Sequence, residues 1–214
     1  MLPCLPEANA VFHVPLYRAQ TRAEMSAMLA ACDDAPRHLV AFSMGGYLAL
    51  EYALSHPGEV ASLVLIGTSA RGLQMRERVA RQATLAWLAE HDYQGMSRQR
   101  LAMFVHPSHR ACAGIVDVVR EMDRSLGKAT LMVQLRETSD RADLLGGLHN
   151  ITCPVLVTGG EEDALVSVED LTAIAQAIPQ ARLQIMPGSG HMLPLEQPVL
   201  LASAVAAFWE TVPQ

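Results

Sequence analysis

The stretch V-A-F-S-M-G-G, residues 40–46, carries the first residue whose setting suggests catalysis, Ser43. An apolar run leads into this serine, and two glycines precede a helix-prone segment. This is the setting of a nucleophile elbow, in which the hydroxyl stands clear of the backbone, beside a base and facing amide N–H groups. So tight a turn needs small residues two positions to either side, here Ala41 and Gly45. Glycine is usual at both positions, so Ala41 departs from the pattern by one methyl. The alternative interpretation of Ser43 is an ordinary serine of a turn or a helix N-cap.

Two later segments carry residue types that a nucleophilic serine requires as partners. The acidic triplet Glu161-Glu162-Asp163 closely follows the apolar run 154–159. His191 ends the sequence P-G-S-G-H, and its two glycines suit a loop that must aim an imidazole ring. A histidine can accept the serine proton, and a carboxylate can fix the histidine tautomer. The three segments together make a catalytic interpretation of Ser43 stronger than the elbow alone.

The elements that must position these residues follow an α/β rhythm. Short apolar runs predict strands at 11–14, 39–42, 61–66, 154–159 and 182–186. Helical spacing predicts helices at 21–32, 44–55, 168–178 and 196–209. Continuous apolar strands separated by helices indicate a parallel sheet that is covered on both faces.

The sequence changes in character between Arg71 and Asn150. Strand-like runs disappear, Arg and Glu become more frequent, and helical patterns are found at 77–90, 97–104, 111–126 and 130–138. We therefore predict one α/β core formed by residues 1–70 and 151–214. Residues 71–150 are predicted to form a helical lid (cap) inserted into it.

Three segments, A-F-S-M-G-G, G-G-E-E-D-A-L-V and P-G-S-G-H-M-L-P-L-E-Q-P, resemble the α/β-hydrolase superfamily, in particular its small bacterial lidded serine esterases. The resemblance implies a mostly parallel sheet with helices on both faces and an inserted helical lid. It also implies that Ser43 is the nucleophile, His191 the general base and later acid, and Asp163 the carboxylate that orients the imidazole. Glu161 and Glu162 are the competing acids.

An oxyanion hole would need two backbone N–H donors beside Ser43. The resemblance implies that Met44, the first helical amide after the serine, supplies one donor. It also implies strands before the elbow, which are here shortened or missing, and a loop that carries the second donor. L-P-C-L, residues 2–5, resembles such a loop, so the N–H of Leu5 is the candidate. The alternative, that residues 1–5 take no part, is favoured by Pro3 and Pro6, which restrict the backbone without donating.

Composition excludes several other classes of protein. The net charge of −6 with no basic run argues against a nucleic-acid surface, and no apolar stretch is long enough to span a bilayer. No signal peptide is recognisable and the four cysteines are scattered, so we expect a cytoplasmic protein with free thiols. His106, His109 and Cys112 have spacing that suggests a metal site, but no further clustered ligands accompany them. A turn in the lid is the preferred interpretation, and no metal or cofactor is expected.

The sequence thus predicts a serine hydrolase that cleaves a small carboxylic ester or related acyl compound through an acyl-enzyme. The many methionines favour packing in the core and lid, and a Met-lined acyl pocket under the lid is a further hypothesis. Two alternatives stay open: a degenerate ligand-binding protein without turnover, and a cofactor-free lyase or perhydrolase on the same scaffold. The expected partner is a small-molecule substrate, and a homodimer is left open.

Overall fold

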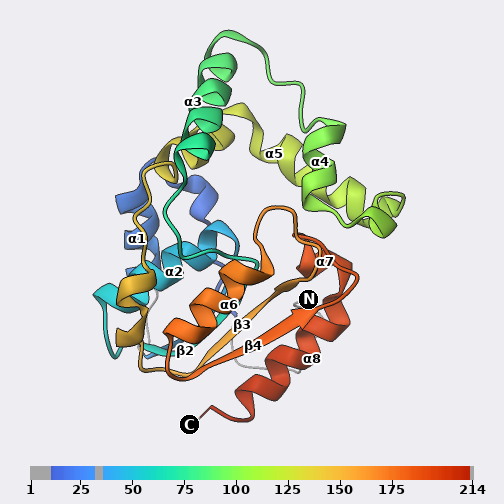
Figure 1. Ribbon diagram of the computed structural model, residues 1–214. Helices are drawn as coiled ribbons and strands as arrows, with labels where there is room; N and C mark the ends of the chain where they lie inside the picture. Colours follow the sequence, from blue (N-terminus) through green and yellow to red (C-terminus); the bar gives the residue numbers. More distant parts are fainter. Residues whose placement is uncertain (1–10, 32–35, 213–214) are drawn as a thin grey trace.

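The computed structural model describes residues 11–31 and 36–212, in which four parallel strands form one sheet in the order β1–β2–β3–β4 (Figure 1). The strands are β1 (Arg37–Phe42), β2 (Val60–Ile66), β3 (Val155–Gly160) and β4 (Ala181–Met186). Their order follows the chain, so each strand pairs with the strand before it. The predicted parallel sheet is confirmed.

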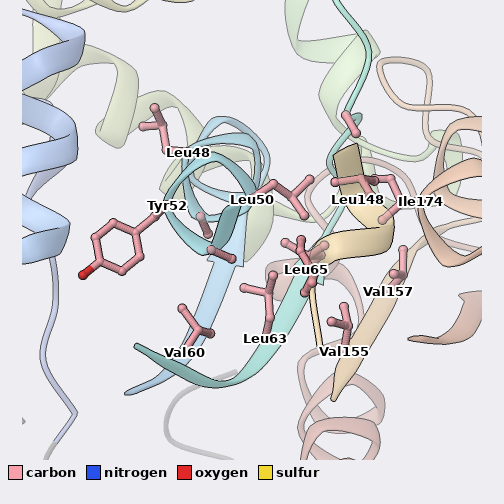
Figure 2. Close-up of a cluster of buried hydrophobic side chains, with 14 of the residues drawn as sticks. Leu48, Leu50, Tyr52, Val60, Leu63, Leu65, Leu148, Val155, Val157 and Ile174 are labelled. Carbon is pink, nitrogen blue, oxygen red and sulfur yellow. The ribbon is translucent and has the colours of Figure 1, made fainter. Parts of the chain in front are cut away.

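The middle strands are apolar without interruption because both of their faces are buried. In β2, Leu63 and Leu65 belong to one hydrophobic cluster, whereas Val64 and Ile66 belong to another. Successive side chains of a strand point to opposite faces, so this alternation assigns the two clusters to the two sides of the sheet. Figure 2 shows the first cluster, with Leu50, from the helix that precedes β2 in the chain, near Leu65.

Helices cover both faces of the sheet. The first cluster packs against α1 (Arg22–Ala30), α2 (Met44–Ser55), the short helix η4 (Leu145–Asn150) and α6 (Val168–Ala177). The second packs against α7 (Leu193–Glu196) and α8 (Pro198–Trp209). The predicted helix 196–209 corresponds to α8, which begins two residues later because Gln197, with φ −134° and ψ 54°, separates it from α7.

The segment between β2 and β3 contains helices and no strand, and we call residues 71–150 the cap. Its helices before η4 are α3 (Met75–Glu90), α4 (Arg98–Phe104), η3 (Pro107–His109) and α5 (Ala113–Glu137). Figure 1 shows α3, α4 and α5 grouped on one side of the α/β core. Within α5, Gly127 has φ 69° and ψ −175°, which breaks the helix between the two segments that the sequence predicted separately.

The predicted strand 11–14 is wrong. These residues form no ladder, and the chain turns into η2 (Leu16–Arg18) with the Leu16 amide donating to the Val14 carbonyl at 2.9 Å. Val11 and Phe12 are 64% and 79% exposed, so their apolar side chains do not face the core. The candidate loop at residues 2–5, including Leu5, lies outside the described residues. No helix within residues 11–31 and 36–212 has both the length and the apolar character needed to cross a membrane.

Candidate active site

Ser43 occupies the sharp turn between β1 and α2, with φ 51° and ψ −116°. It is the one non-glycine residue with positive φ in the described part of the chain. This region of φ/ψ space is strained for residues with a side chain, and such strain concentrates at functional sites. The Ser43 amide donates to the Ile66 carbonyl at 2.9 Å, which fixes the turn to the end of β2.

The close approach that this turn requires occurs at Gly46 rather than at Gly45. A Cβ on Gly46 would lie 2.7 Å from the Thr68 Cβ, a distance that real Cβ atoms do not tolerate. A Cβ on Gly45 would meet the Leu16 side chain at 3.8 Å, an ordinary contact. The second glycine of the motif therefore lets α2 start directly against the residues that follow β2.

The structure brings Ser43, His191 and Asp163 into one hydrogen-bonded row. Ser43 Oγ lies 2.9 Å from His191 Nε2, and His191 Nδ1 lies 2.8 Å from Asp163 Oδ2. The side chains of His191 and Asp163 are 2% and 0% exposed. When Nδ1 carries the proton it donates to Asp163, and Nε2 is left free to accept the proton of Ser43.

Each of these residues follows the carboxyl end of a strand, which is why residues far apart in sequence meet. Ser43 follows β1, Asp163 comes three residues after β3, and His191 comes five residues after β4. The loops after β3 and β4 touch, since a Cβ on Gly160 would lie 2.2 Å from the Ser189 carbonyl oxygen. Ligand sites of open parallel sheets lie at this edge.

Asp163 is held by the backbone of its own loop. Its Oδ1 accepts from the amides of Leu165 and Val166 at 2.8 and 3.1 Å, while Oδ2 faces His191. Two backbone amides and the imidazole therefore satisfy this buried carboxylate. The competing acids lie elsewhere: Glu161 is exposed, and Glu162 accepts from the Ser189 amide at 3.2 Å.

The N-terminus of α2 offers amide donors beside the serine. The Met44 and Gly45 amides donate to no acceptor among residues 11–31 and 36–212, because the first amides of a helix have no intrahelical partner. The helix dipole adds partial positive charge at this end. The arrangement can stabilise a negative oxygen next to Ser43.

Two aromatic rings flank the histidine. Phe42, the last residue of β1, has its ring centroid 5.1 Å from that of His191, and Phe104 of α4 meets the imidazole edge-on at 5.5 Å. Gly67, after β2, also lies against the pair, because a Cβ there would be 3.5 Å from both His191 Nδ1 and Asp163 Oδ2. The sequence analysis did not identify Phe104 or Gly67, and no motif marks either residue.

A cavity of about 160 Å³ lies between α4 and α5. It extends to Met192 in the loop that carries His191, residues 189–192, which we call the histidine loop. Its apolar lining includes Met96, Phe104, Met122, Leu126, Leu131 and Met192. Asp123 lines it too, accepting from the hydroxyl of Tyr93 at 2.5 Å and from the Met96 amide at 2.7 Å. Burial and this hydrogen bond to Asp123 raise the pKa of Tyr93 to about 12.

His106 and His109 lie in the cap beside the histidine loop. His109 Nδ1 is 2.9 Å from Glu196 Oε2, and the His106 amide donates to the same oxygen at 2.9 Å. Cys112 is an exposed free thiol. Residues 11–31 and 36–212 contain no cluster of three or more His, Cys, Asp or Glu side chains suited to a metal ion. The sequence analysis did not single out Glu196.

The chain belongs to the alpha/beta hydrolase fold family, whose sequence profile matches residues 16–198. It is 29% identical to a putative 2-succinyl-6-hydroxy-2,4-cyclohexadiene-1-carboxylate synthase of Bacillus subtilis, over 91% of this chain and 74% of that protein. It is 27% identical to the pimeloyl-[acyl-carrier protein] methyl ester esterase of Chromobacterium violaceum, over 97% of this chain and 82% of that protein. Three further curated relatives are longer, and the chain spans 48% to 56% of their length.

Among solved structures, a thermophilic esterase from Thermogutta terrifontis is similar in fold, with a TM-score of 0.84 and 24% identity. The match covers 99% of this chain and 78% of the esterase. The relatives of the chain include esterases, lipases and other hydrolases.

Proposed function

We propose that this chain is a serine hydrolase that cleaves a small carboxylic ester, or a related acyl compound, through an acyl-enzyme. The observation that carries the proposal is the row Ser43–His191–Asp163, with contacts of 2.9 and 2.8 Å and a buried acid and base. A serine at ordinary turn geometry would not need the strained φ of 51°. Esterases and lipases among the relatives support the same class of reaction.

Acylation begins when Ser43 Oγ attacks the ester carbonyl carbon while its proton passes to His191 Nε2. Asp163 stabilises the imidazolium that forms and keeps Nε2 facing the serine. The carbonyl oxygen becomes an oxyanion, which the Met44 amide stabilises at the N-terminus of α2. The tetrahedral intermediate then collapses, the alcohol leaves with the proton from His191, and the acyl group stays bonded to Ser43.

Deacylation repeats these steps with water as the nucleophile. The water oxygen attacks the acyl carbon while His191 takes a proton from the water. His191 then returns this proton to Ser43 Oγ as the carboxylic acid is released. The rings of Phe42 and Phe104 exclude bulk solvent from the imidazole. No step requires a metal or a cofactor.

The cavity between α4 and α5 is the proposed site of the acyl group. It is lined largely by apolar side chains, three of them methionines, and it adjoins the histidine loop at Met192. Small-molecule pockets are typically about 300–1,000 Å³, so a cavity of about 160 Å³ favours a short acyl chain. Methionine side chains adapt to substrates of differing shape.

A p-nitrophenyl ester series from acetate to decanoate tests the proposal. We expect hydrolysis by the wild type with a preference for short chains, a burst of p-nitrophenol equal to the amount of enzyme, and neither in Ser43→Ala. Glu161→Gln serves as the matched control, since it changes an exposed acid after the same strand as Asp163. Wild-type protein that hydrolyses no ester faster than Ser43→Ala would indicate the non-catalytic alternative.

A non-hydrolytic reaction is the second candidate, because one relative is named as a synthase rather than a hydrolase. The same serine and histidine could exchange protons with a substrate without forming an acyl-enzyme. Product analysis separates the two: hydrolysis yields an acid and an alcohol, and water labelled with ¹⁸O enters the acid. Products that together have the same atoms as the substrate, with no ¹⁸O from water, would favour the lyase interpretation.

A further inference from the structure

Glu196, on α7, is a buried carboxylate that the proposed reaction does not use. Its side chain is 0% exposed, although ionisable carboxylates are seldom fully buried without partners. Both of its oxygens lie 3.2 Å from the amide of Gly190, the residue directly before His191. Its Oε2 also accepts from the His106 amide and lies 2.9 Å from His109 Nδ1.

The partners of Glu196 belong to two segments from different parts of the chain. One is the histidine loop, residues 189–192, which follows β4 and carries His191. The other, residues 104–109 of the cap, we call the bridge segment. The carboxylate joins them because it accepts from a backbone amide in each. An amide buried there without an acceptor would carry a desolvation penalty, so the carboxylate fixes the separation of the two segments.

Two further contacts place the same segments backbone against backbone. The amide of Met192 donates to the carbonyl of Phe104 at 3.0 Å. A Cβ on Gly190 would lie 2.8 Å from the His106 nitrogen, so only glycine allows the loop to approach the bridge segment this closely. His191 therefore lies between Met192, which is bonded to the cap directly, and Gly190, which is linked to the cap through Glu196. Phe104 of the bridge segment touches its ring.

We propose that Glu196 is a positioning residue that aims His191 at Ser43 by clamping the histidine loop to the bridge segment. The inference rests on the proposed function of Ser43 and His191. Glu196 touches no reacting atom and acts through the backbone of Gly190. Because Phe104 also lines the cavity, the clamp ties the wall of the proposed acyl site to the orientation of the base.

Labelling of Ser43 by diisopropyl fluorophosphate tests this without using the acyl site. Ser43 Oγ forms a bond to phosphorus, fluoride leaves, and His191 accepts the serine proton, so the rate depends on the alignment of Ser43 and His191. The end point counts competent sites, and the rate constant therefore refers to folded molecules even when a variant is less stable. Near-UV circular dichroism checks the fold of each variant.

We compare three changes at this position. Glu196→Gln keeps the shape and one acceptor oxygen, and is expected to label within about threefold of wild type. Glu196→Asp keeps the charge, but its side chain is one methylene shorter, so the carboxylate lies farther from the two amides. Glu196→Ala removes the carboxylate altogether. A misplacement of about 1 Å can cost on the order of 100-fold, so we expect a loss of about 10- to 100-fold for Ala and an intermediate loss for Asp. Glu161→Ala, an exposed acid, is the matched control and should label like the wild type.

The clamp is supported if the Gln variant labels faster than the Asp variant and the Asp variant faster than the Ala variant. The geometry of the side chain, rather than its charge, then decides the labelling rate. Asp labelling faster than Gln would assign Glu196 an electrostatic role and overturn the inference. Asp and Ala variants that label within threefold of wild type would also overturn it, and the Asp variant decides alone where the Ala variant does not fold. Wild-type protein that does not label at all refutes the proposed function itself, which is a different result from labelled wild type with unchanged variants.

Discussion

Asp163→Asn is the change whose effect the structure defines most closely. Asp163 Oδ1 accepts from two backbone amides, at 2.8 and 3.1 Å, so the side-chain oxygen of an asparagine must occupy that place. The opposite orientation would set an NH₂ group against two N–H donors and leave them unsatisfied, at about 1–3 kcal/mol each. The NH₂ group therefore faces His191 Nδ1, which must lose its proton in order to accept.

The proton then resides on Nε2, which donates to Ser43 and can no longer take its proton. The same loss of tautomer in a serine protease triad lowers turnover by about 10⁴-fold, and we expect about 10³- to 10⁴-fold here. The assay is the rate of p-nitrophenyl acetate hydrolysis, with Ser43 labelling by a fluorophosphonate as a second readout. Glu162→Gln is the control, since its carboxylate contacts Ser189 and not His191. An Asp163→Asn enzyme within tenfold of wild type, or a Glu162→Gln enzyme that is the more damaged, would refute the assignment of the acid.

Three other predictions concern the acyl site, the cap and the N-terminus. Met122→Trp narrows the cavity and should lower kcat/KM for octanoate by about 10-fold or more while sparing acetate, whereas Met103→Trp, an exposed methionine of α4 outside the cavity lining, should change neither. The raised pKa of Tyr93, about 12, means that unfolded chains lose the phenol proton first, near pH 10, as the pH rises. The stability that this difference contributes is complete below about pH 10 and is lost as the pH rises to about 12. The urea midpoint of unfolding, measured at pH 8, 10 and 11, should therefore fall less steeply with pH in Tyr93→Phe than in the wild type. Equal slopes in the two proteins would contradict this prediction. Deleting residues 1–5 should scarcely change ester turnover, and a loss of about 100- to 1,000-fold would instead assign the Leu5 amide to the oxyanion hole.

The sequence predicted well those parts of the fold that depend on local pattern. Leu63 to Ile66 are apolar without a break because both faces of β2 are covered, and that pattern is visible in one dimension. The strand predicted at residues 11–14 failed because an apolar run shows only that a strand could form there. Whether a neighbouring strand pairs with it is a tertiary property, and Phe12 is instead 79% exposed.

The candidate site divides in the same way. Ser43 and His191 lie in recognisable motifs, but choosing Asp163 over Glu161 and Glu162 required a family resemblance, because three adjacent acids look alike in sequence. The structure separates them by direction: only Asp163 of the triplet lies against His191. Glu196 lies within the quoted segment P-G-S-G-H-M-L-P-L-E-Q-P, but nothing local marks its role. The same holds for the role of Phe104, since each residue acts through contacts between residues about 90 positions apart in the chain.

The most direct test of the central claim is the mass of the protein after reaction with a fluorophosphonate, followed by peptide mapping. We expect one adduct per chain, located on Ser43, that forms far more slowly in a His191→Ala variant, because no base then accepts the serine proton. Ser43→Ala should remain unmodified under the same conditions. An adduct on another serine, or a His191→Ala variant that labels as fast as the wild type, would contradict the claim that His191 activates Ser43.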